Sequence, residues 1–104
     1  MKTTITDSYL EKLFQGKAIS GKPKYSSDIV VKFKRTVQKL QLASNIKDLK
    51  EQRGLNFEAL KGEYKGYFSV RVDRSYRLIL TYKKGKKSNF ADCITVIDLT
   101  NHYQ

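Results

Sequence analysis

The sequence predicts an α+β fold in which an antiparallel sheet of about four strands packs against two N-terminal helices. Apolar residues recur every three or four positions in the first half of the chain and every second position in the second half. These are the periods of helices and strands, respectively. No βαβ unit repeats, which argues against a doubly wound parallel sheet. A chain of 104 residues is long enough for one ordinary domain, which we expect to span residues 1–104.

An edge strand and two helices are expected in the first half. Lys2–Ile5 is short and rich in β-branched residues, as expected of an edge strand. Ser8 and Glu11 have the spacing of a capping box, which predicts that Ser8 caps the start of a short helix. The most regular pattern runs from about Asp28 to Ala43 and predicts a longer helix. Its apolar stripe consists of Val30, Phe33, Val37 and Leu40.

Residues that break helices separate these elements. Gly16, Gly21 and Pro23 predict a loop between the two helices. Beyond the longer helix, Ser44-Asn45 is a candidate cap for one more helical turn, which Gly54 would end.

The second half is expected to form a hairpin and a buried strand. Residues 67–73 and 76–82 alternate between apolar and polar side chains, and the turn between them spans residues 73–75. A second turn is predicted over residues 83–89. It leads to Cys93–Leu99, which is apolar at nearly every position, as expected of a well-buried strand. The hairpin residues expected to face the helices are Phe68, Val70, Val72, Leu78 and Leu80.

The chain is strongly basic, with 21 Lys and Arg against 10 Asp and Glu and a net charge of +11. Residues 1–49 hold 10 basic and 4 acidic side chains and residues 50–104 hold 11 and 6, so the excess is not confined to a tail. A compact domain of this charge attracts polyanions. Nucleic acid is the first candidate partner and an acidic protein the second. An anionic membrane surface is a distant third, and simple solubilisation of the surface is the plainest alternative.

Several classes of protein are excluded by composition. One Cys and one His cannot form a zinc finger or a disulfide framework, and no metal or cofactor is expected. No apolar run approaches the ~20 residues of a membrane span, and the N-terminus lacks the pattern of a signal peptide. We therefore expect a cytoplasmic protein with no membrane partner.

Arg71 and Arg77 are expected to lie directly opposite one another if the hairpin turn has three residues. Like charges opposed across two strands destabilise a sheet. This placement is easier to understand if an anion binds between the two guanidinium groups. The alternatives are that one arginine pairs with Glu58 or Asp98, or that the register differs by one residue.

A carboxylate, a histidine and two arginines are the groups that RNA cleavage without a metal requires. One group removes the proton of the ribose 2′-OH, another protonates the departing 5′-oxygen, and cations stabilise the phosphorane. DNA lacks the 2′-OH, so this chemistry would be specific to RNA. Taken singly, a His-Tyr pair near the terminus is more often a frayed chain end, and Glu58 and Lys61 are ordinary surface residues.

Three separated segments resemble the bacterial RelE/ParE toxin superfamily, namely Glu58–Gly62, Gly66–Val72 and Ser75–Leu80. The Glu ahead of Leu-Lys and the terminal His102-Tyr103 look most like the YoeB branch. The HigB branch would usually place a His where Glu58 stands. It would also end in Asp-Tyr-His, where this chain has Asp98-Leu99-Thr100. Two further departures from the YoeB pattern are Gln104 after the tyrosine and the segment around Gly21-Lys-Pro23.

The resemblance implies a RelE-like fold and a toxin of a type II toxin–antitoxin system. Such a toxin cleaves mRNA in the A site of the 30S ribosomal subunit and is held inactive by a cognate antitoxin, which the charge of +11 leads us to expect to be acidic. By resemblance, Glu58 would be the general base and His102 the general acid. Arg77, supported by Arg71, would stabilise the phosphorane, and Tyr103 would position the scissile nucleotide.

The remaining basic residues near these segments are expected to bind substrate; they are Lys61, Lys65, Arg71 and Arg74. Two other functions are compatible with the resemblance and the charge. One is a ParE-like toxin that inhibits DNA gyrase without nuclease activity. The other is a basic RNA-binding module without catalysis. Replacing Glu58 and His102 distinguishes these alternatives, because only the nuclease needs an acid and a base.

Overall fold

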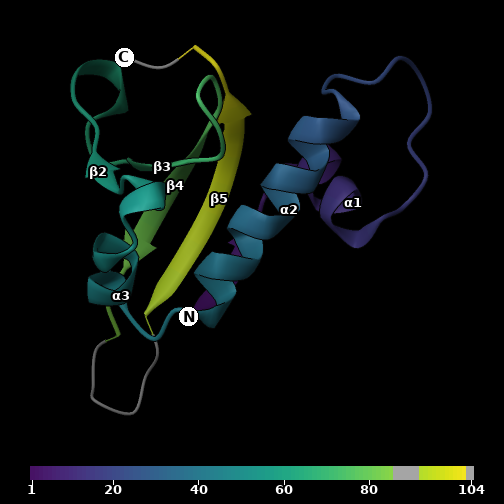
Figure 1. Ribbon diagram of the computed structural model, residues 1–104. Coiled ribbons are helices and arrows are strands. Elements are labelled where there is room, and N and C mark those ends of the chain that lie inside the picture. Colours follow the sequence, from purple (N-terminus) through teal and green to yellow (C-terminus); the bar gives the residue numbers. More distant parts are fainter. Residues whose placement is uncertain (86–91, 103–104) are drawn as a thin grey trace.

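The computed structural model describes residues 1–85 and 92–102 and has a five-stranded sheet of order β1-β5-β4-β3-β2 (Figure 1). The strands are Lys2–Ile5 (β1), Glu58–Ala59 (β2), Phe68–Arg71 (β3), Arg77–Lys83 (β4) and Cys93–Thr100 (β5). The helices are Ser8–Gln15 (α1), Ser27–Leu42 (α2) and Ile46–Glu51 (α3), with short 3₁₀ helices at Arg53–Leu55 (η1) and Gly62–Tyr64 (η2). The predicted α+β class and the helix-on-sheet packing are confirmed. The predicted turn over residues 83–89 lies partly outside the described residues.

The sheet is antiparallel from β5 to β3, as predicted, and β2, a strand of two residues that the sequence did not predict, pairs antiparallel with β3. The strand β1 makes the sheet mixed. β1 is an edge strand that pairs in parallel with β5, Lys2 opposite Cys93 and Ile5 opposite Val96. A parallel pair needs a long crossover connection, and here all the helices and three strands intervene in the chain. Side-chain periodicity does not encode strand direction, so the sequence pattern indicated the strand but not its orientation.

Two helix boundaries differ from the prediction by one residue. Asp7, not Ser8, is the N-cap of α1, because Asp7 has extended backbone angles and its carboxylate accepts a hydrogen bond from the Leu10 backbone N–H at 2.9 Å. The predicted capping box at Ser8 is therefore wrong. Helix α2 begins at Ser27 after the N-cap Ser26, whose hydroxyl accepts from the Ile29 N–H. Asn45 caps α3, as predicted.

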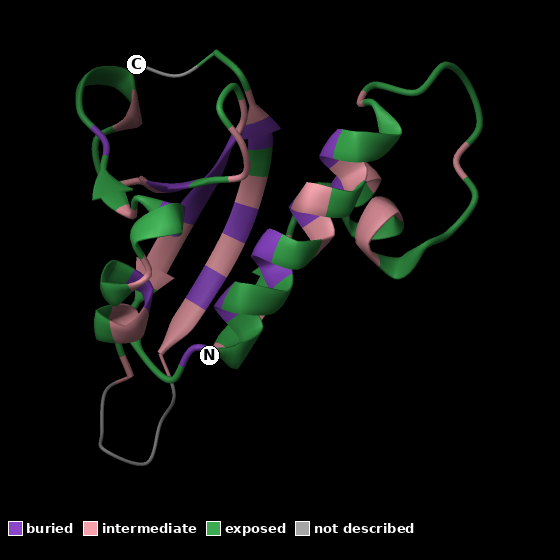
Figure 2. Ribbon diagram, viewed as in Figure 1, coloured by how far each residue is buried: buried purple, intermediate pink, exposed green. Residues whose placement is uncertain are grey.

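The core lies between the helices and one face of the sheet (Figure 2). Phe33, Val37 and Leu40 of α2 are fully buried, as the helical stripe predicted. Ile29 begins the buried stripe in place of Val30, which is only half-buried. The strands β3, β4 and β5 contribute apolar residues to the core; these are Val70, Leu78, Leu80, Ile94, Val96 and Leu99.

A β-bulge in β5 explains why this strand is apolar at nearly every position. Leu80 pairs with Val96 and Ile79 pairs with Asp98, so Ile97 is the extra residue. The bulge changes the alternation of faces, so that Val96 and Leu99 both point into the core although they are three residues apart. It also places Asp98 and Thr100 on the face away from the helices.

Within the part of the chain that the structure describes, no helix is both long and apolar enough to cross a membrane.

Candidate active site

The candidate site lies on the sheet face opposite the helical layer. Residues directly opposite one another in a sheet share a face, so the register defines two neighbouring rows of side chains. One row consists of Glu58, Ser69, Ile79 and Asp98, and the next consists of Arg71, Arg77 and Thr100. The predicted register, with Arg71 opposite Arg77, is therefore confirmed.

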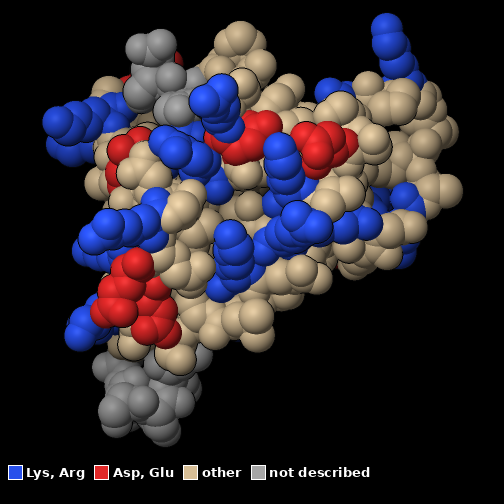
Figure 3. Space-filling model, in the orientation of Figure 1, with Lys and Arg blue, Asp and Glu red and all other residues tan. Residues whose placement is uncertain are grey.

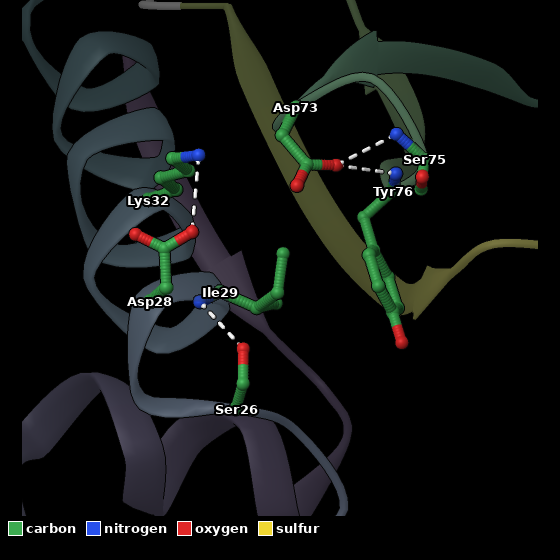
Figure 4. A network of polar contacts seen from close by, with 7 residues as sticks. All are labelled: Ser26, Asp28, Ile29, Lys32, Asp73, Ser75 and Tyr76. Carbon is green, nitrogen blue, oxygen red and sulfur yellow. Dashed lines mark hydrogen bonds and ion pairs between the residues drawn. The ribbon is translucent and has the colours of Figure 1, made fainter.

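The three-residue turn that sets this register is held by Asp73 (Figure 4). One carboxylate oxygen of Asp73 accepts hydrogen bonds from the backbone N–H groups of Ser75, at 2.8 Å, and Tyr76, at 2.7 Å. The backbone N–H of Val72 donates to the Tyr76 carbonyl and closes the turn. This is the usual use of Asp at a turn, and it places Arg77 opposite Arg71.

Arg77 is buried, with only 2% of its surface exposed. Its Nε donates to the Ser69 hydroxyl at 2.8 Å, and its Nη2 donates to the Asn56 carbonyl at 2.6 Å. The same Nη2 lies 3.6 Å from Oε1 of Glu58. A buried guanidinium is tolerated only when its charge is paired and its N–H groups are hydrogen-bonded, and these contacts meet that requirement.

Glu58 forms the outer half of this ion pair. Its side chain is 46% exposed, so the carboxylate is held by a buried cation yet remains accessible from solvent. Of the arrangements that the opposed arginines allowed, the structure has the one in which Arg77 pairs with Glu58. Arg71 lies opposite Arg77 and is exposed.

Two residues that support the site were not identified from the sequence. Ser69 is fully buried and accepts from Arg77, and the Asn56 carbonyl accepts from the same side chain. Asn56 follows η1 with a positive φ of 44°, a conformation that Asn adopts more readily than most residues. A polar residue in a strand was the signal at Ser69, but nothing local indicated that its partner would be a guanidinium.

His102 lies two residues beyond the end of β5. Thr100, the last residue of β5, lies opposite Arg77. The Thr100 hydroxyl accepts a hydrogen bond from the His102 backbone N–H at 2.9 Å, and the His102 side chain is exposed. Tyr103, the other predicted terminal residue, lies outside the described residues.

The predicted substrate-binding cations are all exposed. Lys61 precedes η2, Lys65 follows it, and Arg74 lies in the β3–β4 turn. Figure 3 shows that Lys and Arg side chains spread over the visible face instead of forming one cluster, as the even distribution along the sequence predicted. In the described ranges 1–85 and 92–102, no three His, Cys, Asp or Glu side chains lie where they could share a metal ion.

Comparison with known proteins identifies the family. Residues 3–93 match the sequence model of the HigB-like toxins, described as RelE-like toxins of the type II toxin–antitoxin system HigB. The chain belongs to this family. The matched region of the toxin includes Glu58, Ser69, Arg71 and Arg77 but ends before His102. No curated protein matches the toxin in sequence.

Two solved structures share the fold of the toxin. A YoeB/ParE toxin from Agrobacterium tumefaciens is 22% identical, with a TM-score of 0.55 over 99% of this chain and 100% of that one. The YoeB-YefM complex from Staphylococcus aureus contains a chain that is 21% identical, with the same TM-score of 0.55 over 99% of this chain and 98% of that one. The RelE/ParE superfamily expected from the three sequence segments is therefore confirmed.

The site of the toxin can support proton transfer next to a bound anion. An accessible carboxylate can accept a proton, and the cations Arg71 and Arg77 lie on the same face of the sheet. Because Arg77 is anchored by Ser69 and Asn56, it holds the Glu58 carboxylate in one place. Preorganised charge of this kind favours reactions in which negative charge develops.

Proposed function

We propose that the toxin is an endoribonuclease that cleaves mRNA in the ribosomal A site without a metal ion and so inhibits translation. The observation that carries the proposal is the Glu58–Arg77 pair, in which a 46% exposed carboxylate lies 3.6 Å from a guanidinium with 2% exposure. A surface ion pair that served only solubility would not need a buried arginine with three further hydrogen bonds.

In the proposed reaction, Glu58 accepts the proton of the ribose 2′-OH while the 2′-oxygen attacks the adjacent phosphorus. The bond from phosphorus to the 5′-oxygen breaks, and His102 gives its proton to that oxygen. The products are a 2′,3′-cyclic phosphate and a free 5′-OH. Glu58 then holds the proton taken from the 2′-OH, His102 lacks the proton it gave to the 5′-oxygen, and exchange with solvent restores both groups.

The arginines would have different tasks in this reaction. Arg77 is buried and already hydrogen-bonded, so it would orient Glu58 and stabilise the phosphorane through its positive charge. Arg71 is exposed on the same row and would contact the phosphate directly. Lys61, Lys65 and Arg74 would bind the neighbouring backbone of the RNA, and Tyr103 would position the scissile nucleotide.

An acidic antitoxin is the proposed protein partner. Membership of a toxin–antitoxin family and the presence of YefM in the complex from S. aureus support a protein partner. The net charge of +11 supports an acidic one, since complementary charge speeds association and favours the correct partner. We expect this partner to cover the exposed Glu58 and Arg71 and thereby exclude RNA.

The test is in-vitro translation of a defined mRNA followed by primer extension. The wild type is compared with E58Q and H102A, and E63Q serves as the matched control because Glu63 is an exposed carboxylate of the adjacent η2. We expect new 5′ ends at ribosome-occupied codons with the wild type and E63Q. Loss of about 10²–10⁴-fold is expected for E58Q and H102A, the usual contribution of a general base or acid.

The other outcomes separate the competing functions. Blocked translation with intact mRNA would overturn cleavage in favour of RNA binding alone. If translation were unaffected, inhibition of DNA gyrase would be the next activity to measure. Equal cleavage of naked and ribosome-bound mRNA would reject the dependence on the ribosome but not the nuclease.

A further inference from the structure

A tyrosine from the loop between α1 and α2 contacts the sheet beside the candidate active site. The Tyr25 hydroxyl donates a hydrogen bond to the Leu99 carbonyl at 2.9 Å. Its ring packs edge-on against the ring of Tyr76, with 5.9 Å between the centroids. Leu99 immediately precedes Thr100, and Tyr76 immediately precedes Arg77. One side chain therefore contacts both the end of β5, which leads to His102, and the residue that directly precedes Arg77.

The Leu99 carbonyl lies on a part of β5 that β1 does not reach. β1 pairs with β5 only from Cys93 to Val96. A strand edge beyond its neighbour presents unpaired backbone groups, and a carbonyl without a partner there is destabilising. The Tyr25 hydroxyl takes the place that a longer β1 would have occupied, and it holds the last residues of β5 before His102.

Tyr25 is itself held from the helical side. Its ring packs against the ring of Tyr9, with 6.1 Å between the centroids, and the Tyr9 hydroxyl accepts a hydrogen bond from the Lys24 N–H at 3.0 Å. The next residue, Ser26, caps α2. The α1–α2 loop swings away from the sheet and returns at the start of α2 (Figure 1), and Figure 4 shows Ser26 at this point and the Tyr76 ring extending from the β3–β4 turn.

We infer that Tyr25 is a positioning residue for the candidate active site, fixing the end of β5 that carries His102 and the turn that leads into Arg77. The inference rests on the proposed function, because it assigns Tyr25 an effect on the cleavage that His102 and Arg77 would perform. The segment around Gly21-Lys-Pro23, a departure from the YoeB pattern, thus leads to Tyr25, which would position site residues without being one of them.

The first test compares Y25F with Y9F in the cleavage assay. Y25F keeps the ring and removes only the hydroxyl that holds Leu99. Y9F keeps the ring that packs on Tyr25 and removes a hydroxyl that bonds to the Lys24 N–H of the loop. We expect Y25F to lower kcat about tenfold with KM unchanged, because small displacements of catalytic groups slow the chemical step. Y9F should retain the wild-type kcat. Equal kcat values for Y25F and the wild type, or equal losses in Y25F and Y9F, would overturn the inference.

A second measurement does not depend on cleavage. Backbone amide resonances of residues 100–102 and of Arg77 are compared among the wild type, Y25F and Y9F. Shifts at these residues in Y25F alone support the coupling, and their absence overturns it whatever the activity. If the wild type cleaves no RNA but these shifts occur, the proposed function fails while the physical link from Tyr25 to β5 is upheld.

Discussion

The two faces of the sheet are built from the same strands but are stabilised in different ways. On the helical face, Val70, Leu78 and Leu80 are fully buried in an apolar cluster to which the helices contribute. On the opposite face, Ser69 and Arg77 are equally buried, yet they are joined by hydrogen bonds. Apolar burial is insensitive to direction, whereas a buried charge must have its partners at defined positions. The helical face therefore stabilises the toxin, and the other face holds one carboxylate in place.

The largest expected effect is on the helical face. F33A should lower the free energy of unfolding by ~3–5 kcal/mol, because the Phe33 side chain is fully buried and its removal leaves a cavity. Urea denaturation monitored by circular dichroism measures the change. V31A on the same helix is the control, since Val31 is 47% exposed and should cost less than about 0.5 kcal/mol. Similar losses in the two variants would contradict the assignment of the core.

An intermediate effect is expected on the opposite face. S69A removes a buried hydrogen-bond acceptor of the Arg77 Nε, which should cost about 1–3 kcal/mol. R71Q on the same face should leave stability unchanged or raise it slightly, because it removes a like charge opposite Arg77. The same denaturation experiment compares them. If R71Q were the more destabilising variant, the assignment of Arg77 as the buried arginine would be wrong.

The smallest expected effect is a loss of stability at high pH that involves Tyr25. This residue joins the helical layer to the end of β5. Burial, followed by the charges of Asp98 and Asp7, raises the pKa of Tyr25 to about 12. In the unfolded chain a tyrosine has a pKa of about 10. The folded state therefore keeps this proton in a range where the unfolded state loses it. The resulting stabilisation is complete below pH ~10 and is lost as the pH rises toward ~12.

Urea midpoints measured between pH ~9 and ~11.5 test this difference. The wild type should lose stability over this range more steeply than Y25F, which has no phenol to ionise at this position. Y9F retains Tyr25 and should follow the wild type. Parallel curves for the wild type and Y25F would show that the phenol of Tyr25 ionises equally easily in the folded and unfolded states.

Much of the fold could be predicted because it depends on near neighbours in the chain. The apolar stripe of α2 and the alternation along β3 and β4 involve residues two to four positions apart. The three-residue turn then placed Arg71 opposite Arg77 by geometry alone. Glu58 was identified as a site residue through resemblance, since a single exposed carboxylate has no distinctive local pattern. The cap at Asp7 was not predicted because Asp and Ser are both common caps. The backbone angles in the folded chain make Asp7, and not Ser8, the cap.

The sequence by itself determined the order of the helices and of the strands other than β2, the buried faces, the opposed arginines and the family. Only the tertiary structure decided that Arg77 is the buried arginine and that Glu58 pairs with it. It also decided that β1 runs parallel to β5, that Ile97 forms a bulge, and that Tyr25 reaches Leu99. These contacts join segments far apart in the chain: Glu58 and Arg77 are 19 residues apart, and Ile5 and Val96 are 91 apart. Their geometry follows from the packing of whole strands and helices, which no local pattern of side chains encodes.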